Sequence, residues 1–487
     1  MRPRFILTAA LCAICTNPLP AAAADLVLEE CRISGGAGFP GITARCGILE
    51  RHEDPSDRNS PLLYLRVAVV PALSLEPEPD AFVPIAGGPG QSSIEFYSLL
   101  SHAFEQIRRT RNIVLLDQRG TGSSARMDCD IGDEIVAGQL TPGQTIAATE
   151  DCLEALPYRP EFFTTSVAVG DLEALRIALG IPRFNLYGVS YGTRVAQHYV
   201  RRYPGSVRTV ILDGVVPPQL ALGAGIAIEA QKALGGIFAR CAKNAACNAR
   251  FPELVDAFAV LEERLAAGEV SVDLANPLTG VPQTLQFGAA ELAAAIRLMS
   301  YNPHTVALMP LLIHEAVSGN YAPLASQFLM AMARMSDLLA IGMHNAVVCT
   351  EDAPFYDAEN VSREALESTY IGPMQVEALQ AICSVWPAGV LDPEFKAPLA
   401  TNTPVLLLSG DADPVTPPHF AELAAVRLGN ARHLIGRNQG HGQAATTCMP
   451  DIMGRFVEAA RVNDLDTDCL LRQFAMPFFV DFSGPDP

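Results

Sequence analysis

A serine at position 190 lies between glycines in the stretch Gly188-Val189-Ser190-Tyr191-Gly192. The apolar residues before it are typical of a buried strand, and residues 193–203 after it follow a helical pattern. In such a G-x-S-x-G turn, the strained backbone lifts the serine hydroxyl above the sheet, and the glycines allow tight closure. Ser190 is therefore the candidate nucleophile for acyl transfer.

A serine hydroxyl needs a histidine base, and the base needs a carboxylate that orients it. After a G-x-S-x-G serine, the acid and then the base follow on loops after later strands. The apolar run 405–408 leads to Asp411 and Asp413, and residues 432–435 lead to His441, which lies between two glycines. We assign His441 as the base and Asp413 as the acid, with Asp411 as the alternative, because the carboxylate must extend past the strand end.

Negative charge that develops on the attacked carbonyl requires two backbone N–H groups, an oxyanion hole. One donor is expected from Tyr191, the residue directly after the nucleophile. The other is expected from the loop after an earlier strand, where Ala86-Gly87-Gly88-Pro89-Gly90 ends the run 81–86. We assign Gly88, although an ordinary Gly-Pro turn is the alternative interpretation of this segment.

Strands must alternate with helices to position these residues. Apolar runs that end in glycine or proline predict strands, and residues 167–179 predict a helix that ends at Gly180. The alternation favours a mainly parallel sheet with helices on both faces, an α/β fold. The predicted strands before and after the nucleophile are residues 62–71, 81–86, 112–116, 207–212, 404–408 and 432–435.

The alternation of strands and helices stops after Pro217-Pro218. From there to about residue 400 the sequence predicts mostly helices, apart from a hairpin at 270–287. An insertion of this length is too long for a plain loop, so we expect a helical cap over the site. The expected organisation is a signal peptide (1–24), an N-terminal part of the core (25–217), the cap (218–400) and a C-terminal part of the core (401–487).

Residues 1–24 combine a basic start, a short apolar run and an alanine-rich end, which predicts a secretory signal peptide. A membrane anchor is the weaker alternative, because about 20 apolar residues are needed to span a bilayer. The formal net charge of −19 argues against nucleic-acid partners and anionic lipid surfaces. We expect a secreted or periplasmic protein that is not inserted in a membrane, and the oligomeric state stays open.

Ten cysteines follow the predicted leader, an even number that suits an oxidising compartment. Pairing neighbours along the chain is the simplest hypothesis, since sequence alone does not determine connectivity. We expect neither a metal site nor another cofactor, because the cysteines are scattered and no metal-binding motif occurs. The hypothesised pairs are Cys31–Cys46, Cys129–Cys152, Cys241–Cys247, Cys349–Cys383 and Cys448–Cys469.

Taken together, the motifs resemble those of the α/β-hydrolase peptidases of the proline iminopeptidase and tripeptidyl aminopeptidase group. They extend over about residues 85–445 in the order of that family, and the region after 400 resembles the C-terminal part of secreted tripeptidyl aminopeptidases. The motifs are Gly87-Gly88-Pro89-Gly90, Asp117-Gln118-Arg119-Gly120-Thr121-Gly122-Ser123, Gly188-Val189-Ser190-Tyr191-Gly192, Asp411-Ala412-Asp413-Pro414-Val415-Thr416-Pro417 and Gly440-His441-Gly442.

The resemblance implies a serine aminopeptidase that releases short N-terminal fragments from peptides with free amino termini. Exopeptidases of this group hold the substrate amine with acidic side chains of the cap, and Glu351 and Asp352 are the residues we assign to this role. A carboxylesterase or lipase with the same triad is the nearest alternative, because the acyl chemistry is shared. An inactive binding protein on the same fold is the remote one.

Overall fold

The computed structural model describes residues 26–36, 40–129 and 140–485, so the predicted leader lies outside the described residues. A nine-stranded sheet in the order β1-β2-β3-β5-β4-β6-β7-β10-β11 forms the core. The strands are β1 (Glu29–Ile33), β2 (Ile42–His52), β3 (Leu62–Val70), β4 (Ala81–Ile85), β5 (Asn112–Leu116), β6 (Phe184–Val189), β7 (Val207–Asp213), β10 (Val405–Gly410) and β11 (Ala431–Gly436).

The strands from β5 to β11 in this order run parallel, whereas β1, β2 and β3 pair antiparallel and β3 is antiparallel to β5. All residues of β4, β6 and β10 are buried, which explains their continuous apolar runs, because helices cover both faces. The predicted α/β fold is confirmed, and so are the six strands predicted besides the one that precedes Ser190. The hairpin β1–β2 was not predicted.

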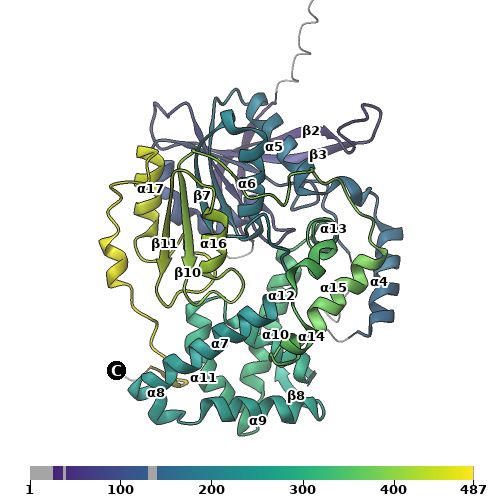
Figure 1. The fold of residues 1–487 in the computed structure, drawn as a ribbon, viewed down its shortest axis with the longest axis vertical. Coiled ribbons are helices and arrows are strands. Elements are labelled where there is room, and N and C mark those ends of the chain that lie inside the picture. Colours follow the sequence, from purple (N-terminus) through teal and green to yellow (C-terminus); the bar gives the residue numbers. More distant parts are fainter. Residues whose placement is uncertain (1–25, 37–39, 130–139, 486–487) are drawn as a thin grey trace, which may run out of the picture.

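Alternate residues of each strand enter different hydrophobic clusters, since successive side chains of a strand point to opposite faces. Leu407 belongs to the cluster under α5 (Thr165–Ala178), α6 (Tyr191–Arg202) and α16 (Pro418–Ala425). Leu406 and Leu408 belong to the cluster under α1 (Ser93–Leu100), α2 (Glu105–Arg108) and α17 (Met449–Ala459). The sheet is therefore the middle layer of three (Figure 1).

A second, largely helical body with its own hydrophobic cluster lies below the sheet in Figure 1. It includes the predicted hairpin, β8 (Val270–Ala275) with β9 (Pro282–Phe287). Its helices are α7 (Ile226–Lys243), α8 (Ala245–Arg250), α9 (Leu254–Ala266), α10 (Ala289–Met299), α11 (Pro303–Val317) and α12 (Ala322–Leu338).

The later part of this insertion joins the core. Met343 and Val347 of α13 (Ile341–Glu351) pack into the cluster of the central sheet. Helix α15 (Met374–Val385) packs against α13 and against α4 (Pro142–Ala155). Between α13 and α15 lie the 3-10 helix Ala353–Glu359 and α14 (Arg363–Glu367). The insertion is thus anchored on the sheet through α13.

The C-terminal segment leaves the core after α17 and runs along the side of the molecule toward α8 (Figure 1). Phe478 is buried in the hydrophobic cluster of the helical body, next to the small pair β12 (Phe479–Asp481) and β13 (Gly484–Pro485). The division that assigned residues 401–487 entirely to the core therefore needs correction. Although these residues follow α17 of the core in sequence, burial of Phe478 attaches them to the helical body.

Five disulfides connect the ten cysteines in the nearest-neighbour pattern, which confirms the hypothesised pairing. Cys31–Cys46 links β1 to β2, and Cys349–Cys383 links α13 to α15. Each bond reduces the conformational freedom of the unfolded chain. No helix in the described ranges combines the length and the apolar composition that a bilayer crossing requires.

Candidate active site

Ser190 occupies the turn between β6 and α6 with φ 54° and ψ −125°, a conformation that non-glycine residues rarely adopt. Its N–H donates to the carbonyl oxygen of Asp213 at the end of β7 (2.9 Å). A Cβ atom on Gly188 would lie 2.3 Å from the carbonyl oxygen of Gly192, so this turn closes only with glycine. The strain is localised at the residue with the reactive hydroxyl, as in a nucleophile elbow.

The structure brings His441 and Asp413 together from the loops after the adjacent parallel strands β11 and β10. Nδ1 of His441 lies 2.8 Å from Oδ2 of Asp413. The carboxylate also accepts the N–H groups of Val415 and Thr416 and the Thr416 hydroxyl, at 2.8 to 2.9 Å. Asp411 is solvent-exposed and accepts the N–H of Asn438 instead. Of the two acids, Asp413 is the one that contacts the imidazole.

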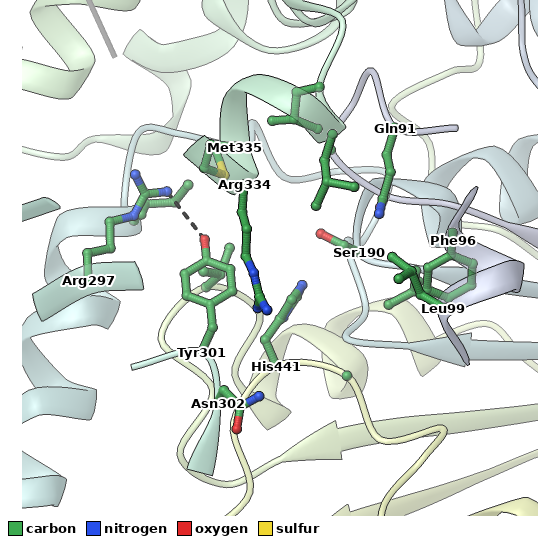
Figure 2. A pocket seen from close by; sticks show the side chains of 18 of the residues that line it. Gln91, Phe96, Leu99, Ser190, Arg297, Tyr301, Asn302, Arg334, Met335 and His441 are labelled. Carbon is green, nitrogen blue, oxygen red and sulfur yellow. Dashed lines mark hydrogen bonds between the residues drawn. The ribbon is translucent and has the colours of Figure 1, made fainter. Parts of the chain in front are cut away.

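Ser190 and His441 line one cavity, and both side chains point into it in Figure 2. No hydrogen bond joins the two residues in the described structure. Catalytic hydrogen bonds are often long in unliganded enzymes and shorten when substrate binds. The arrangement therefore has the components of a serine nucleophile, its base and an orienting acid at the carboxyl ends of the parallel strands β6, β10 and β11.

The loop that contains Gly88 packs directly against the nucleophile. A Cβ on the preceding Gly87 would lie 3.0 Å from Cβ of Ser190, and Gly88 itself has φ +103°. Tyr191 is the first residue of α6, where backbone N–H groups have no acceptor within the helix. Both segments expected to donate to an oxyanion thus lie beside Ser190.

Two family models match this chain. The model described as the alpha/beta hydrolase fold matches residues 80–238, which include Gly88 and Ser190. The model described as TAP-like protein matches residues 368–469, which include Asp413 and His441. The chain has the α/β-hydrolase fold.

The relatives of this hydrolase include enzymes named as peptidases. Serine protease Hip1 of Mycobacterium tuberculosis is 27% identical over 380 residues, 68% of this chain and 69% of that protein. Tripeptidyl aminopeptidase of Streptomyces lividans is 30% identical over 27% of this chain and 28% of its own. The putative hydrolase YuaR of Escherichia coli is 30% identical over 34% of this chain, and the match spans only about a third of its length.

Glu351 and Asp352 do not reach the cavity of the hydrolase. They are 0% and 1% exposed, and Asp352 forms a two-pronged ion pair with Arg194 of α6 (2.8 and 2.9 Å). Glu351 accepts the N–H and the hydroxyl of Thr165 (2.7 and 3.0 Å), and burial raises its pKa to about 7. Their assignment to the substrate amine needs correction, because both carboxylates are engaged in anchoring α13 to the core.

The electrostatics of the hydrolase favour a charged imidazole. Burial acts to lower the pKa of His441, but the charge of Asp413 and its hydrogen bond outweigh burial, so the pKa is raised above 6.5. The pKa of Asp413 is lowered by His441 and by the N–H donors of its loop, although burial opposes this. Asp413 therefore stays ionised while His441 accepts a proton.

We expect kcat/KM of the hydrolase to rise with pH through an ionisation above pH 6.5. Only neutral His441 can accept the Ser190 proton, and a raised pKa keeps the imidazole protonated to higher pH. The measurement is kcat/KM for an uncharged substrate between about pH 5 and pH 9. An acid limb centred below pH 6.5 would contradict the assignment of His441 as base.

Sequence reasoning missed Asp213, which is fully buried at the end of β7. Its carboxylate accepts the N–H groups of Gln443 and Ala444, two and three residues after His441, and the Tyr187 hydroxyl (2.8 to 2.9 Å). Burial raises the pKa of Asp213 to about 6. The signal was present, since an aspartate at the carboxyl end of a predicted parallel strand lies at the active edge of the sheet. Asp213 therefore holds the loop that carries His441 at the end of β7.

Cap residues of the site were also missed, because nothing in their local sequence distinguishes them. Tyr301, after α10, accepts the backbone N–H of His441 (2.9 Å), and its ring meets the imidazole edge-on at 5.3 Å. Arg297 and Arg334 line the same cavity from α10 and α12. The helical insertion therefore contacts His441 and forms part of the cavity wall around Ser190.

Proposed function

We propose that this hydrolase is an exported serine aminopeptidase that releases short N-terminal fragments from peptides. Ser190 attacks the scissile carbonyl while His441 takes its proton, and Asp413 stabilises the resulting imidazolium. The N–H groups of Gly88 and Tyr191 bind the oxyanion. His441 then protonates the leaving amine, and water hydrolyses the acyl-enzyme with His441 again as base.

The size of the cavity is the main observation that supports a peptide substrate. Its volume is about 1770 Å³, and its walls come from the core and from the cap. Small-molecule sites are commonly ~300–1,000 Å³, so this space suits several peptide residues better than a small ester. A cap over the nucleophile also limits access by a continuous folded chain, which favours a chain end as substrate.

Two carboxylates of the wall supply a partner for an amino terminus. Glu95 on α1 and Asp337 on α12 both line the cavity. Burial raises the pKa of Glu95, and the charges of Asp117 and Asp337 add to that effect. A cation between such acids relieves their repulsion. The α-amino group has a pKa of ~8 and is largely cationic at neutral pH.

The relatives named serine protease and tripeptidyl aminopeptidase support peptide substrates. Export is supported by the five disulfides, which persist in oxidising compartments. The signal peptide predicted for residues 1–24 would direct the protein to the export machinery.

The test compares tripeptide anilides with free and acetylated amino termini. We expect the wild type to prefer the free amine, and Glu95→Gln to raise KM for that substrate by on the order of tenfold, since a charge-assisted hydrogen bond is lost. The acetylated substrate should be unaffected by the substitution. Glu105→Gln, an exposed glutamate outside the cavity, is the matched control.

Equal cleavage of free and acetylated peptides would contradict the aminopeptidase proposal. Hydrolysis of p-nitrophenyl esters without hydrolysis of any peptide anilide would favour an esterase on the same triad.

A further inference from the structure

Two arginines in the cavity have no carboxylate partner, although the chain has 53 acidic residues. Arg297 and Arg334 form no ion pair within the described chain, whereas buried Arg111, Arg119 and Arg194 each pair with an aspartate. Arg297 and Arg334 therefore differ from these arginines, because they lie at the cavity wall without a counter-charge among the described residues.

Arg297 is partly buried, and its Nε atom is fully buried without an acceptor. Its Nη2 atom reaches only the Tyr301 hydroxyl, at 3.5 Å. A buried donor without a partner costs free energy that a bound acceptor would recover. The structure thus holds donor capacity at the cavity wall that no group of the described chain uses.

Arg334 of α12 adds a second guanidinium to the cavity that Arg297 of α10 also lines. Figure 2 shows its side chain extending from α12 into the space above His441, with Tyr301 and Arg297 on one side and Ser190 on the other. Asp337 lies one helical turn further on, but it forms no ion pair with Arg334, and its charge acts on Glu95. The guanidinium is left free to bind a ligand.

The chemistry of these donors selects a carboxylate. A guanidinium presents a planar fork of N–H groups that matches the two carboxylate oxygens, and a tyrosine hydroxyl adds a further donor. Because Tyr301 also contacts His441 through its carbonyl oxygen and its ring, an anion held here lies close to the reacting bond. Such a site orients the substrate as well as binding it.

We propose that Arg297, Tyr301 and Arg334 form a carboxylate-binding subsite, so that preferred substrates present an anionic group near the scissile bond. The proposal rests on the proposed function. The carboxylate comes from an aspartate or glutamate side chain or from the C-terminus of a short peptide. With Glu95 and Asp337 as the subsite for the cationic amino terminus, the cavity would recognise both charges of a short peptide.

The test uses matched peptides that differ only in charge: glutamate against glutamine beside the cleaved bond, and a free against an amidated C-terminus. We expect the wild type to prefer the carboxylate in at least one pair. Arg334→Gln should lower kcat/KM for that substrate by ~10–100-fold, mainly through KM, and change the neutral partner by less than about twofold.

Arg427→Gln is the matched control, because Arg427 is also exposed and lies outside the cavity. Arg334 lies on the surface of α12, so its replacement should leave the fold intact, and Arg297→Gln serves as the second variant. An equal loss on charged and neutral substrates, or no preference in the wild type for either carboxylate, would overturn the subsite.

A second pair of substrates separates the subsite from the peptidase proposal. p-Nitrophenyl hemisuccinate carries a carboxylate and p-nitrophenyl acetate does not. Failure to cleave peptides, together with an Arg334-dependent preference for the hemisuccinate, would refute the peptidase and support the subsite. Cleavage of peptides without any dependence on Arg334 would refute the subsite alone.

Discussion

Replacement of Ser190 by alanine is expected to lower kcat by on the order of 10⁶-fold, because nucleophile, base and acid act as one unit. The hydroxyl lies at the turn between β6 and α6, lines the cavity with His441 and has Gly87 packed against its Cβ. The measurement is steady-state hydrolysis of a peptide anilide or ester, together with covalent labelling by a fluorophosphonate probe.

Alanine keeps the backbone and the Cβ of Ser190, so the thermal unfolding temperature should change little. Ser368→Ala, an exposed serine outside the cavity, is the control and should keep both activity and labelling. If Ser190→Ala retained most of the activity, another residue would have to be the nucleophile, and the proposed mechanism would fail.

Replacement of Asp413 by asparagine is expected to lower kcat by on the order of 10⁴-fold. An asparagine amide would place an N–H donor or a neutral oxygen opposite Nδ1 of His441, where the carboxylate now lies at 2.8 Å. The imidazole would lose the charge that raises its pKa, together with the bond that selects its tautomer. The measurement is kcat for the same substrate at the pH optimum of each variant.

Asp411→Asn, two residues earlier in the same loop, is a matched control. Asp411 accepts a backbone N–H from Asn438, and an asparagine oxygen can still accept it. Activity should therefore stay within a few-fold of the wild type. Similar losses in both variants would indicate that loop structure, and not the carboxylate beside His441, determines the rate.

The cap residues show where prediction from sequence was insufficient. Glu351 and Asp352 were assigned to the substrate because acidic side chains of a cap suit an amine, but both are buried, and Asp352 is paired with Arg194. Burial and pairing depend on segments far apart in the chain. Glu95 and Asp337, which do line the cavity, come from α1 and α12 and share no motif.

The hairpin β1–β2 was missed for a related reason. β2 is an antiparallel strand in which only Ala44, Cys46 and Leu49 are buried, and exposed residues lie between them. Such strands have a weaker pattern than the continuously apolar β4, β6 and β10, which were predicted. The continuously apolar strands were therefore predicted, whereas the antiparallel edge formed by β1 and β2 was not.

The sequence by itself determined the turn at Ser190, the strands of the central sheet and the order in which nucleophile, acid and base follow. These features are local, since strand burial, glycine turns and neighbouring cysteines leave patterns within a few tens of residues. Only the tertiary structure decided that Asp413 and not Asp411 meets His441, that Asp213 holds the loop after β11, and that Arg297 and Arg334 line the cavity without a carboxylate partner among the described residues. Those contacts depend on how the helical insertion packs over the sheet, and no periodicity along the chain encodes such packing.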